Sequence, residues 1–161
     1  MVKDTVRFLA VLFVAFALAP SAAHLLELPN KIGLTRDQYL TVQQIYNGWA
    51  LLGIVAMGAL IATLLLAILV RRSPRQFGLA AAAFACVAAT QVVFWTWTFP
   101  MNRATRNWQA LPQQWEPLRA QWEYSHAAAA LFNLAALVLL LLSLVAALRD
   151  ERAHSASAHR A

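Results

Sequence analysis

Two histidine and glutamate pairs carry the clearest chemical signal in this chain of 161 residues. His24 and Glu27 are three positions apart, and Glu123 and His126 are three positions apart in the reverse order. Residues three apart lie on one face of an α-helix, so each pair would present an imidazole beside a carboxylate. Imidazole nitrogens and carboxylate oxygens are ligands of Fe, Cu and Zn. The four side chains therefore predict a site for a single metal ion between two helices.

A second interpretation assigns these side chains no cofactor. The carboxylates lie near the expected water boundary, where they could extend to solvent or pair with Lys31 or Arg103. Each histidine would then only hydrogen-bond to its neighbours. A third interpretation is a haem between His24 and His126, because the small residues at 127–130 permit a close approach. The expected cofactor is thus one metal ion, a haem or none.

Four long apolar segments must position these residues. They cover about 6–28, 46–70, 77–100 and 124–148, and each exceeds the roughly 18 apolar residues that a spanning helix needs. Hydrophobic residues make up 61% of the chain and charged residues 12%, which leaves too little polar surface for a water-soluble globule. Long Ala- and Leu-rich runs favour helices over barrel strands. The expected fold class is all-α, an integral membrane four-helix bundle over residues 1–148.

The basic residues predict the orientation of this bundle. Of the 13 Lys and Arg residues, eight lie in the N-terminus, the short connection 71–75 and the C-terminal end, and the other five lie in the two longer connections. Basic loops favour the cytoplasmic side, so we expect both termini in the cytoplasm and a multi-pass protein of the cell inner (plasma) membrane. Because these charges flank apolar runs instead of forming one face, the expected partner is the lipid bilayer and not nucleic acid.

The two ends of the chain need separate interpretations. Lys3 and Arg7, an apolar run and the small residues at 21–23 resemble a cleavable signal peptide. The apolar run continues to residue 28 and Asp4 is unusual in a signal, so we expect the first segment to be retained as a span. The polar segment 149–161 is predicted to be a disordered cytoplasmic tail.

Aromatic and polar residues gather at one end of the predicted bundle. All six Trp and all three Tyr fall towards the expected outer side, whereas aromatic belts normally mark both interfaces. Gln91, Trp95, Thr98 and Asn102 recur at three- or four-residue spacing, so they could form one inward stripe of the third span. Some of these rings are expected to anchor the interface, and the rest would line an outward-facing pocket together with Gln91.

Three motifs in the C-terminal half lie in a recognisable order. They are Pro-x-Asn at 100–102, a Trp-rich connection with Leu118-Arg119, and Trp-x-x-x-His at 122–126. In these motifs the chain resembles the anthrone-oxygenase-like family of small four-helix membrane proteins. The resemblance implies oxidation of a hydrophobic aromatic small molecule, an electron-rich polycyclic phenol, by molecular oxygen at the methylene opposite its carbonyl. It implies no particular cofactor.

The resemblance also implies roles for individual residues. His126 would be the general base that removes a C–H proton. Asn102 and Arg103 would stabilise the oxyanion that then develops. The rings that would stack on the substrate are Trp95, Trp122 and Tyr46.

Two non-catalytic functions stay open beside the enzyme. One is a metal- or haem-binding membrane module, and the other is a small assembly or transport protein. Four spans without an internal repeat or a broken helix pair give little sign of alternating access. The sequence contains no Gly-rich phosphate loop, nucleophile elbow or zinc-protease motif, which disfavours NTPase, esterase and peptidase chemistry. The oligomeric state is not predicted.

Overall fold

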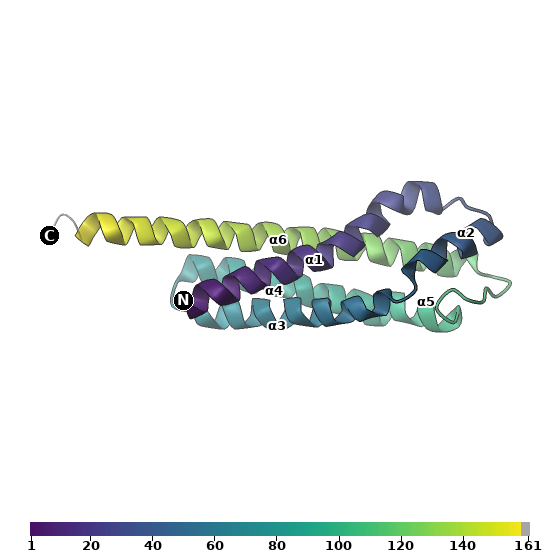
Figure 1. The fold of residues 1–161 in the computed structure, drawn as a ribbon, viewed down its shortest axis with the longest axis horizontal. Coiled ribbons are helices and arrows are strands. Elements are labelled where there is room, and N and C mark those ends of the chain that lie inside the picture. The colour runs from purple at the N-terminus through teal and green to yellow at the C-terminus, as the bar shows by residue number, and fades with distance from the viewer. Residues whose placement is uncertain (159–161) are drawn as a thin grey trace.

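The computed structural model describes residues 1–158, and every regular element in this part of the chain is helical (Figure 1). The α-helices are α1 (Val2–Lys31), α2 (Arg36–Gln43), α3 (Gly53–Leu69), α4 (Pro74–Val93), α5 (Phe99–Ala104) and α6 (Glu116–Ala158). Two short 3₁₀-helices, η1 (Gln44–Tyr46) and η2 (Trp49–Leu52), lie between α2 and α3. A π-helical segment, η3 (Phe94–Thr98), joins α4 to α5.

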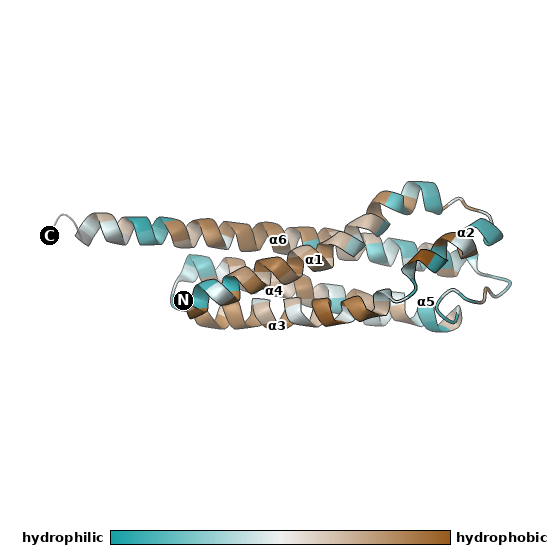
Figure 2. Ribbon diagram, in the orientation of Figure 1, coloured by the Kyte–Doolittle hydropathy of each residue, from teal (hydrophilic) through white to brown (hydrophobic). Residues whose placement is uncertain are grey.

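Four helical stretches are long and apolar enough to cross a membrane. They are Val2–Lys31, Trp49–Leu69, Pro74–Ala104 and Glu116–Ser157. The predicted all-α class with four such helices is therefore confirmed. Apolar residues fill the middle of the bundle, whereas polar residues gather around α2, α5 and the two chain ends (Figure 2). Length and hydropathy are those of a multi-pass membrane protein.

The four long helices pack as consecutive antiparallel neighbours. α1 packs on α3 and α6, and α4 packs on the same two helices. The start of α1 and the end of α6 lie at one end of the bundle, and α2 and α5 lie at the other (Figure 1). Because α1 ends and α6 begins at the α2 and α5 end, the two histidine and glutamate pairs come to the same end.

Small side chains pack the half of the bundle near the chain termini. The buried core there includes Ala10, Ala59, Ala62, Ala80, Ala83 and Ala136. Small residues let neighbouring helix backbones approach closely. Gly58 shows the closeness, because a Cβ added there would lie 2.7 Å from the Phe13 ring. Larger apolar side chains such as Ile54 and Leu131 face outward, as suits a lipid surrounding.

The other half of the bundle contains most of the irregular backbone. Pro20 and Pro29 lie inside α1, where each removes one helical hydrogen bond. Gly48 separates η1 from η2 with a φ of 88°, a left-handed conformation that favours glycine. The π-helical η3 interrupts the third span. Departures from regular helix are thus concentrated where the predicted site residues lie.

The last helix is longer than the sequence predicted. α6 continues ten residues beyond the predicted end at 148, to Ala158, so residues 149–158 are helical and differ from the predicted disordered tail. Residues 159–161 lie outside the described residues. The difference arises because Ala, Glu and Arg are good helix formers, and extending an existing helix is easy. The tail is also tied to α4, since Gln76 Nε2 donates to Asp150 Oδ2 at 2.8 Å.

Candidate functional site

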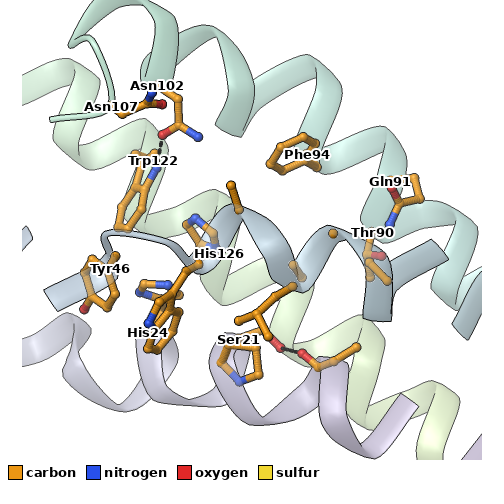
Figure 3. A pocket seen from close by; sticks show the side chains of 18 of the residues that line it. Ser21, His24, Tyr46, Thr90, Gln91, Phe94, Asn102, Asn107, Trp122 and His126 are labelled. Carbon is orange, nitrogen blue, oxygen red and sulfur yellow. Dashed lines mark hydrogen bonds between the residues drawn. The ribbon is translucent and has the colours of Figure 1, made fainter. Parts of the chain in front are cut away.

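A cavity of about 640 Å³ lies among α1, α3, α4 and α6, at the end of the bundle that α2 and α5 cover (Figure 3). Small and apolar wall residues include Ala17, Pro20, Ala56, Met57, Val87 and Phe94. Polar side chains in the wall include His24, Tyr46, Gln91, Asn102, Trp122 and His126. Small-molecule sites typically have volumes of about 300–1,000 Å³ and combine apolar walls with a few polar groups. The cavity meets both criteria.

Two imidazoles from different helices meet at the wall of this cavity (Figure 3). The ring centroids of His24 on α1 and His126 on α6 are 4.2 Å apart, and the ring planes are inclined by 35°. The packing of α1 against α6 causes this contact. His24 is only 3% exposed, and within the described chain its Nδ1 has no hydrogen-bond partner. A neutral imidazole can both accept and donate a proton, so the pair can exchange protons with a bound molecule.

Aromatic rings surround the imidazole pair. The centroid of Trp122 lies 4.3 Å from that of His126 and 5.0 Å from that of His24. Tyr46 and Trp49 pack on the other side of His24, with centroids at 4.5 Å and 5.7 Å. Edge and tilted contacts of this kind hold rings in one orientation. The neighbouring rings therefore constrain the orientation of both imidazoles.

One hydrogen bond fixes the amide of Asn102. Trp122 Nε1 donates to Asn102 Oδ1 at 2.7 Å (Figure 3). An indole N–H can only donate, so the amide must turn its oxygen towards the indole and its NH₂ group away from it. Asn102 lines the cavity. Its amide nitrogen is consequently a donor held ready for an acceptor on a bound molecule.

A buried lysine closes the α2 end of the site. Lys31, the last residue of α1, is 3% exposed. Its Nζ donates to Tyr46 Oη at 2.8 Å and lies 3.1 Å from Glu123 Oε1 and 3.6 Å from Glu27 Oε2. An ammonium group has three donors, and three acceptors surround this one. Burying a charge requires such compensation.

The two carboxylates also receive tyrosine hydroxyl groups. Tyr39 Oη donates to Glu123 Oε1 at 2.8 Å, and Tyr46 Oη donates to Glu27 Oε2. Gln43 Nε2 donates in turn to Tyr39 Oη at 2.6 Å. These bonds connect α1, α6 and the segment that contains α2 and η1. We call Glu27, Lys31, Tyr39, Tyr46 and Glu123 the ionic network.

The surroundings of the two tyrosines favour the neutral phenol. Burial and the adjacent Glu123 carboxylate raise the pKa of Tyr39 well above its ordinary value of 10.0. Burial and the hydrogen bond to Glu27 raise the pKa of Tyr46 in the same direction. Each carboxylate would repel a phenolate. Both hydroxyl groups therefore remain hydrogen-bond donors at neutral pH.

Several buried polar atoms in the cavity wall have no hydrogen-bond partner among residues 1–158. They are His24 Nδ1, Gln43 Oε1 and Trp108 Nε1. The three side chains are each at most 4% exposed. Leaving a buried polar atom unpaired costs about 1–3 kcal/mol, so folded proteins rarely leave several together. A bound molecule that supplies partners would recover this cost.

The structure brings most of the predicted site residues together. Those that line the cavity are His24, Tyr46, Gln91, Trp95, Asn102, Trp122 and His126. Arg103 is exposed and does not belong to the cavity wall. Trp95 lines the edge of the cavity but is 60% exposed, so its side chain departs in part from the inward stripe predicted for the third span. The reason is η3, whose π-helical geometry departs from the α-helical spacing on which that prediction was based.

The predicted metal centre is not formed. Among residues 1–158, no group of three or more His, Cys, Asp or Glu side chains is arranged to hold a metal ion. The carboxylates of Glu27 and Glu123 instead surround the Lys31 ammonium, which is the ion pairing that the sequence left as an alternative. The imidazoles of His24 and His126 are in contact, so a planar haem does not fit between them.

Sequence reasoning missed the depth of Lys31 and the role of Tyr39. From the sequence, Lys31 is one of the charges of an outer connection and Tyr39 is one of the rings at the outer end, without a stated role. In the structure Lys31 is buried, and Tyr39 is fully buried and bonds to Glu123. One signal was available. Glu27 and Lys31 are four residues apart, which is the favourable order for a helical ion pair.

In comparisons with known proteins, no family model, no curated protein and no solved structure matches the chain.

Proposed function

We propose that this protein is a membrane-embedded oxygenase of the anthrone-oxygenase-like kind, which binds a flat hydrophobic aromatic molecule in the cavity and oxidises it with molecular oxygen. The observation that carries the proposal is the contact of His24 and His126, 4.2 Å between ring centroids, at the wall of a largely apolar cavity. A purely structural histidine pair would not need a cavity beside it. Both the resemblance in the C-terminal half and the aromatic wall favour an aromatic substrate.

The proposed chemistry begins with removal of a proton. The methylene group of an anthrone is acidified by the two aromatic rings and by the carbonyl group opposite. His126, beside the cavity and in contact with His24, accepts that proton as general base. The negative charge moves to the carbonyl oxygen of the substrate. The amide NH₂ of Asn102, oriented by Trp122, donates to that oxygen.

Oxidation of the resulting carbanion requires one molecule of oxygen. A C–O bond forms at the former methylene carbon, and the O–O bond then breaks. One oxygen atom remains as the new carbonyl group, and the other leaves as water with the two methylene hydrogens. Four electrons pass from the substrate carbon to oxygen, so no further reductant is needed.

The proposal extends to the placement of the chain. We infer that the four long helices cross the inner (plasma) membrane with both termini in the cytoplasm and the cavity towards the outer side. Two observations support this orientation: the excess of basic residues near the terminal end, and the position of the start of α1 and the end of α6 at the same end of the bundle (Figure 1).

Oxygen consumption with anthrone as the probe tests the enzyme. In purified protein reconstituted into lipid nanodiscs, His126→Ala should lower anthrone-dependent oxygen consumption by about 10²–10⁴-fold, which is the usual contribution of a general base. Leu131→Ala is the matched control, because Leu131 lies on the same helix and is 60% exposed. It should retain full activity. Equal thermal unfolding of the three proteins would show that the loss is chemical.

Two outcomes would refute this function. One is undiminished oxygen consumption by a folded His126→Ala protein. The other is wild-type protein that binds anthrone stoichiometrically, as seen by quenching of tryptophan fluorescence, and yet consumes no oxygen. The second outcome would establish a non-catalytic binding protein.

A further inference from the structure

The cavity reaches the outside on the flank of the bundle between α3 and η3. Three residues there line the cavity and are also exposed, namely Gly53 and Met57 on α3 and Trp95 on η3. Met57 is 47% exposed and Trp95 is 60% exposed. A residue that borders both the cavity and the outside marks an opening. We call these three residues the lateral mouth.

The lateral mouth lies within the length of the spans. Met57 is eight residues after Trp49, the first residue of the second span, which corresponds to about 12 Å along a helix. Trp95 is nine residues before Ala104, the last residue of the third span, which corresponds to about 13 Å. The headgroup layer on each side of a bilayer is only about 5–8 Å thick. Both residues therefore face hydrocarbon in a bilayer that these helices cross.

The loop end of the cavity has a different lining. Tyr39, Trp108, Leu111, Trp115 and Trp122 form a buried aromatic cluster there. Arg119 strengthens it, with its guanidinium 4.4 Å from the centroid of Trp115 and one Nη donating to Leu34 O at 2.7 Å. Beside this cluster, Asn47, Asn107 and Gln109 line the cavity and are also exposed, so the cavity has a second opening at the loop end, with a polar rim.

We propose that the molecule bound in the cavity enters sideways from the lipid through the lateral mouth, and not from the water at the loop end. The ligand is thus of the class that dissolves in the hydrocarbon of the bilayer. Only the identification of this ligand as an aromatic molecule rests on the proposed function. The route itself rests on the exposure of Gly53, Met57 and Trp95, which form an apolar opening within the length of the spans, whereas the opening at the loop end has a polar rim.

A single cysteine inside the cavity can report the route. Cys86 is the only cysteine in the sequence, so Cys86→Ala provides a cysteine-free background. Ala129 lies on the cavity wall, and Ala129→Cys places a thiol there. In lipid vesicles, N-phenylmaleimide, which dissolves in the bilayer, should label this thiol at least 10-fold faster than a sulfonated maleimide that stays in water. The reverse order of rates would overturn the proposed route.

Blocking variants sharpen this test. A Cβ added at Gly53 would meet no heavy atom within 4 Å, so Gly53→Trp can fold and fill the mouth. It should slow labelling by N-phenylmaleimide at least 10-fold. Gly78→Trp is the matched control, because Gly78 on α4 is exposed and equally open but does not line the cavity. It should leave the rate unchanged.

The outcomes separate the route from the chemistry. Slower labelling in Gln109→Trp but not in Gly53→Trp would show entry from the water and refute the lateral route. Absence of any labelling of Ala129→Cys would show a sealed cavity and refute it as well. Labelling needs no turnover, so it tests the route independently of the enzyme. If the labelling rates are as expected but the wild-type protein consumes no oxygen, the proposed oxygenase is refuted and the lateral route is not.

Discussion

The two ends of the bundle pack the same four helices in different ways. Near the termini, alanine side chains from all four helices meet, and one polar chain of bonds runs from Arg7 through Gln76 to Asp150. Towards α2 and α5, the helices carry imidazole, indole and carboxylate groups and enclose about 640 Å³. Small residues thus let the four helices pack closely near the termini, whereas imidazole, indole and phenol rings occupy the other end, where a cavity remains.

The largest difference between the two ends should appear when a buried charge is removed. Lys31→Met leaves Glu123 buried without its cation and should lower the free energy of unfolding by about 3–5 kcal/mol. Arg7→Met at the other end should cost less, about 1–2 kcal/mol, because Arg7 bonds to the neutral Gln76 and its acidic neighbour Asp4 is exposed. Reversible unfolding in mixed detergent measures both values.

The double variant Lys31→Met with Glu123→Gln is the control for this comparison. It removes both charges, so it should recover part of the lost stability. Equal losses in the free energy of unfolding for Lys31→Met and Arg7→Met would contradict the expectation that the charge of Lys31 contributes more to stability than the charge of Arg7.

Enlarging a small side chain should show the opposite pattern, with the larger loss of stability in the half of the bundle near the chain termini. Ala83 is fully buried in the alanine core, and Ala83→Leu should lower the free energy of unfolding by about 1–3 kcal/mol, because there is no room for the larger side chain. Ala129 borders the cavity, and Ala129→Leu should cost less than about 1 kcal/mol. The same unfolding assay distinguishes them. A larger cost at Ala129 would mean that the cavity is filled in the folded protein.

The smallest expected effect concerns the tyrosines, which occur only at the loop end. The folded-state pKa of Tyr39 and of Tyr46 is raised above 10.0, so both phenols ionise first in the unfolded chain. Their contribution to stability is fully present below pH about 10 and is lost as the pH rises above that value. Tyr39→Phe should therefore flatten the fall in the free energy of unfolding between about pH 9 and pH 11.

Absorbance near the phenolate band provides an independent check of this prediction. Since Tyr39 stays neutral in the folded protein, its removal should leave the phenolate absorbance of folded protein at about pH 11 unchanged. A lower absorbance in Tyr39→Phe would show that Tyr39 ionises while the protein is folded, and would contradict the assigned environment.

The fold could be predicted because hydrocarbon leaves a chain few choices. Each apolar run had to be a helix, and its length fixed the number of spans. The end of α6 could not be predicted in this way, because a charged helix that projects past its neighbours is decided by the propensity of residues 149–158 and not by hydropathy. Figure 2 shows this polar extension of α6 beyond the other helices.

The site was only partly predictable because it depends on contacts between helices. Helical spacing put His24 and His126 at one depth, and the structure brings them together. The spacing rule held only in part at Trp95, where η3 departs from the α-helix. No local pattern indicated that Tyr39 would fold back from the α1 to α3 connection onto Glu123. Such pairing across the bundle becomes visible only when side chains are placed in space.

The π-helical turn makes the protein unusually sensitive to chain length at one point. Within a regular helix, each residue advances the chain by about 100° around the axis. Deleting Thr96 from η3, so that the remaining residues continue as α-helix, would rotate everything that follows by about that angle and turn Asn102 away from Trp122. A single extra residue, carried in η3, therefore places the amide oxygen of Asn102 against the indole N–H of Trp122. Loss of one codon here would displace that amide while leaving the hydrophobic span long enough to insert.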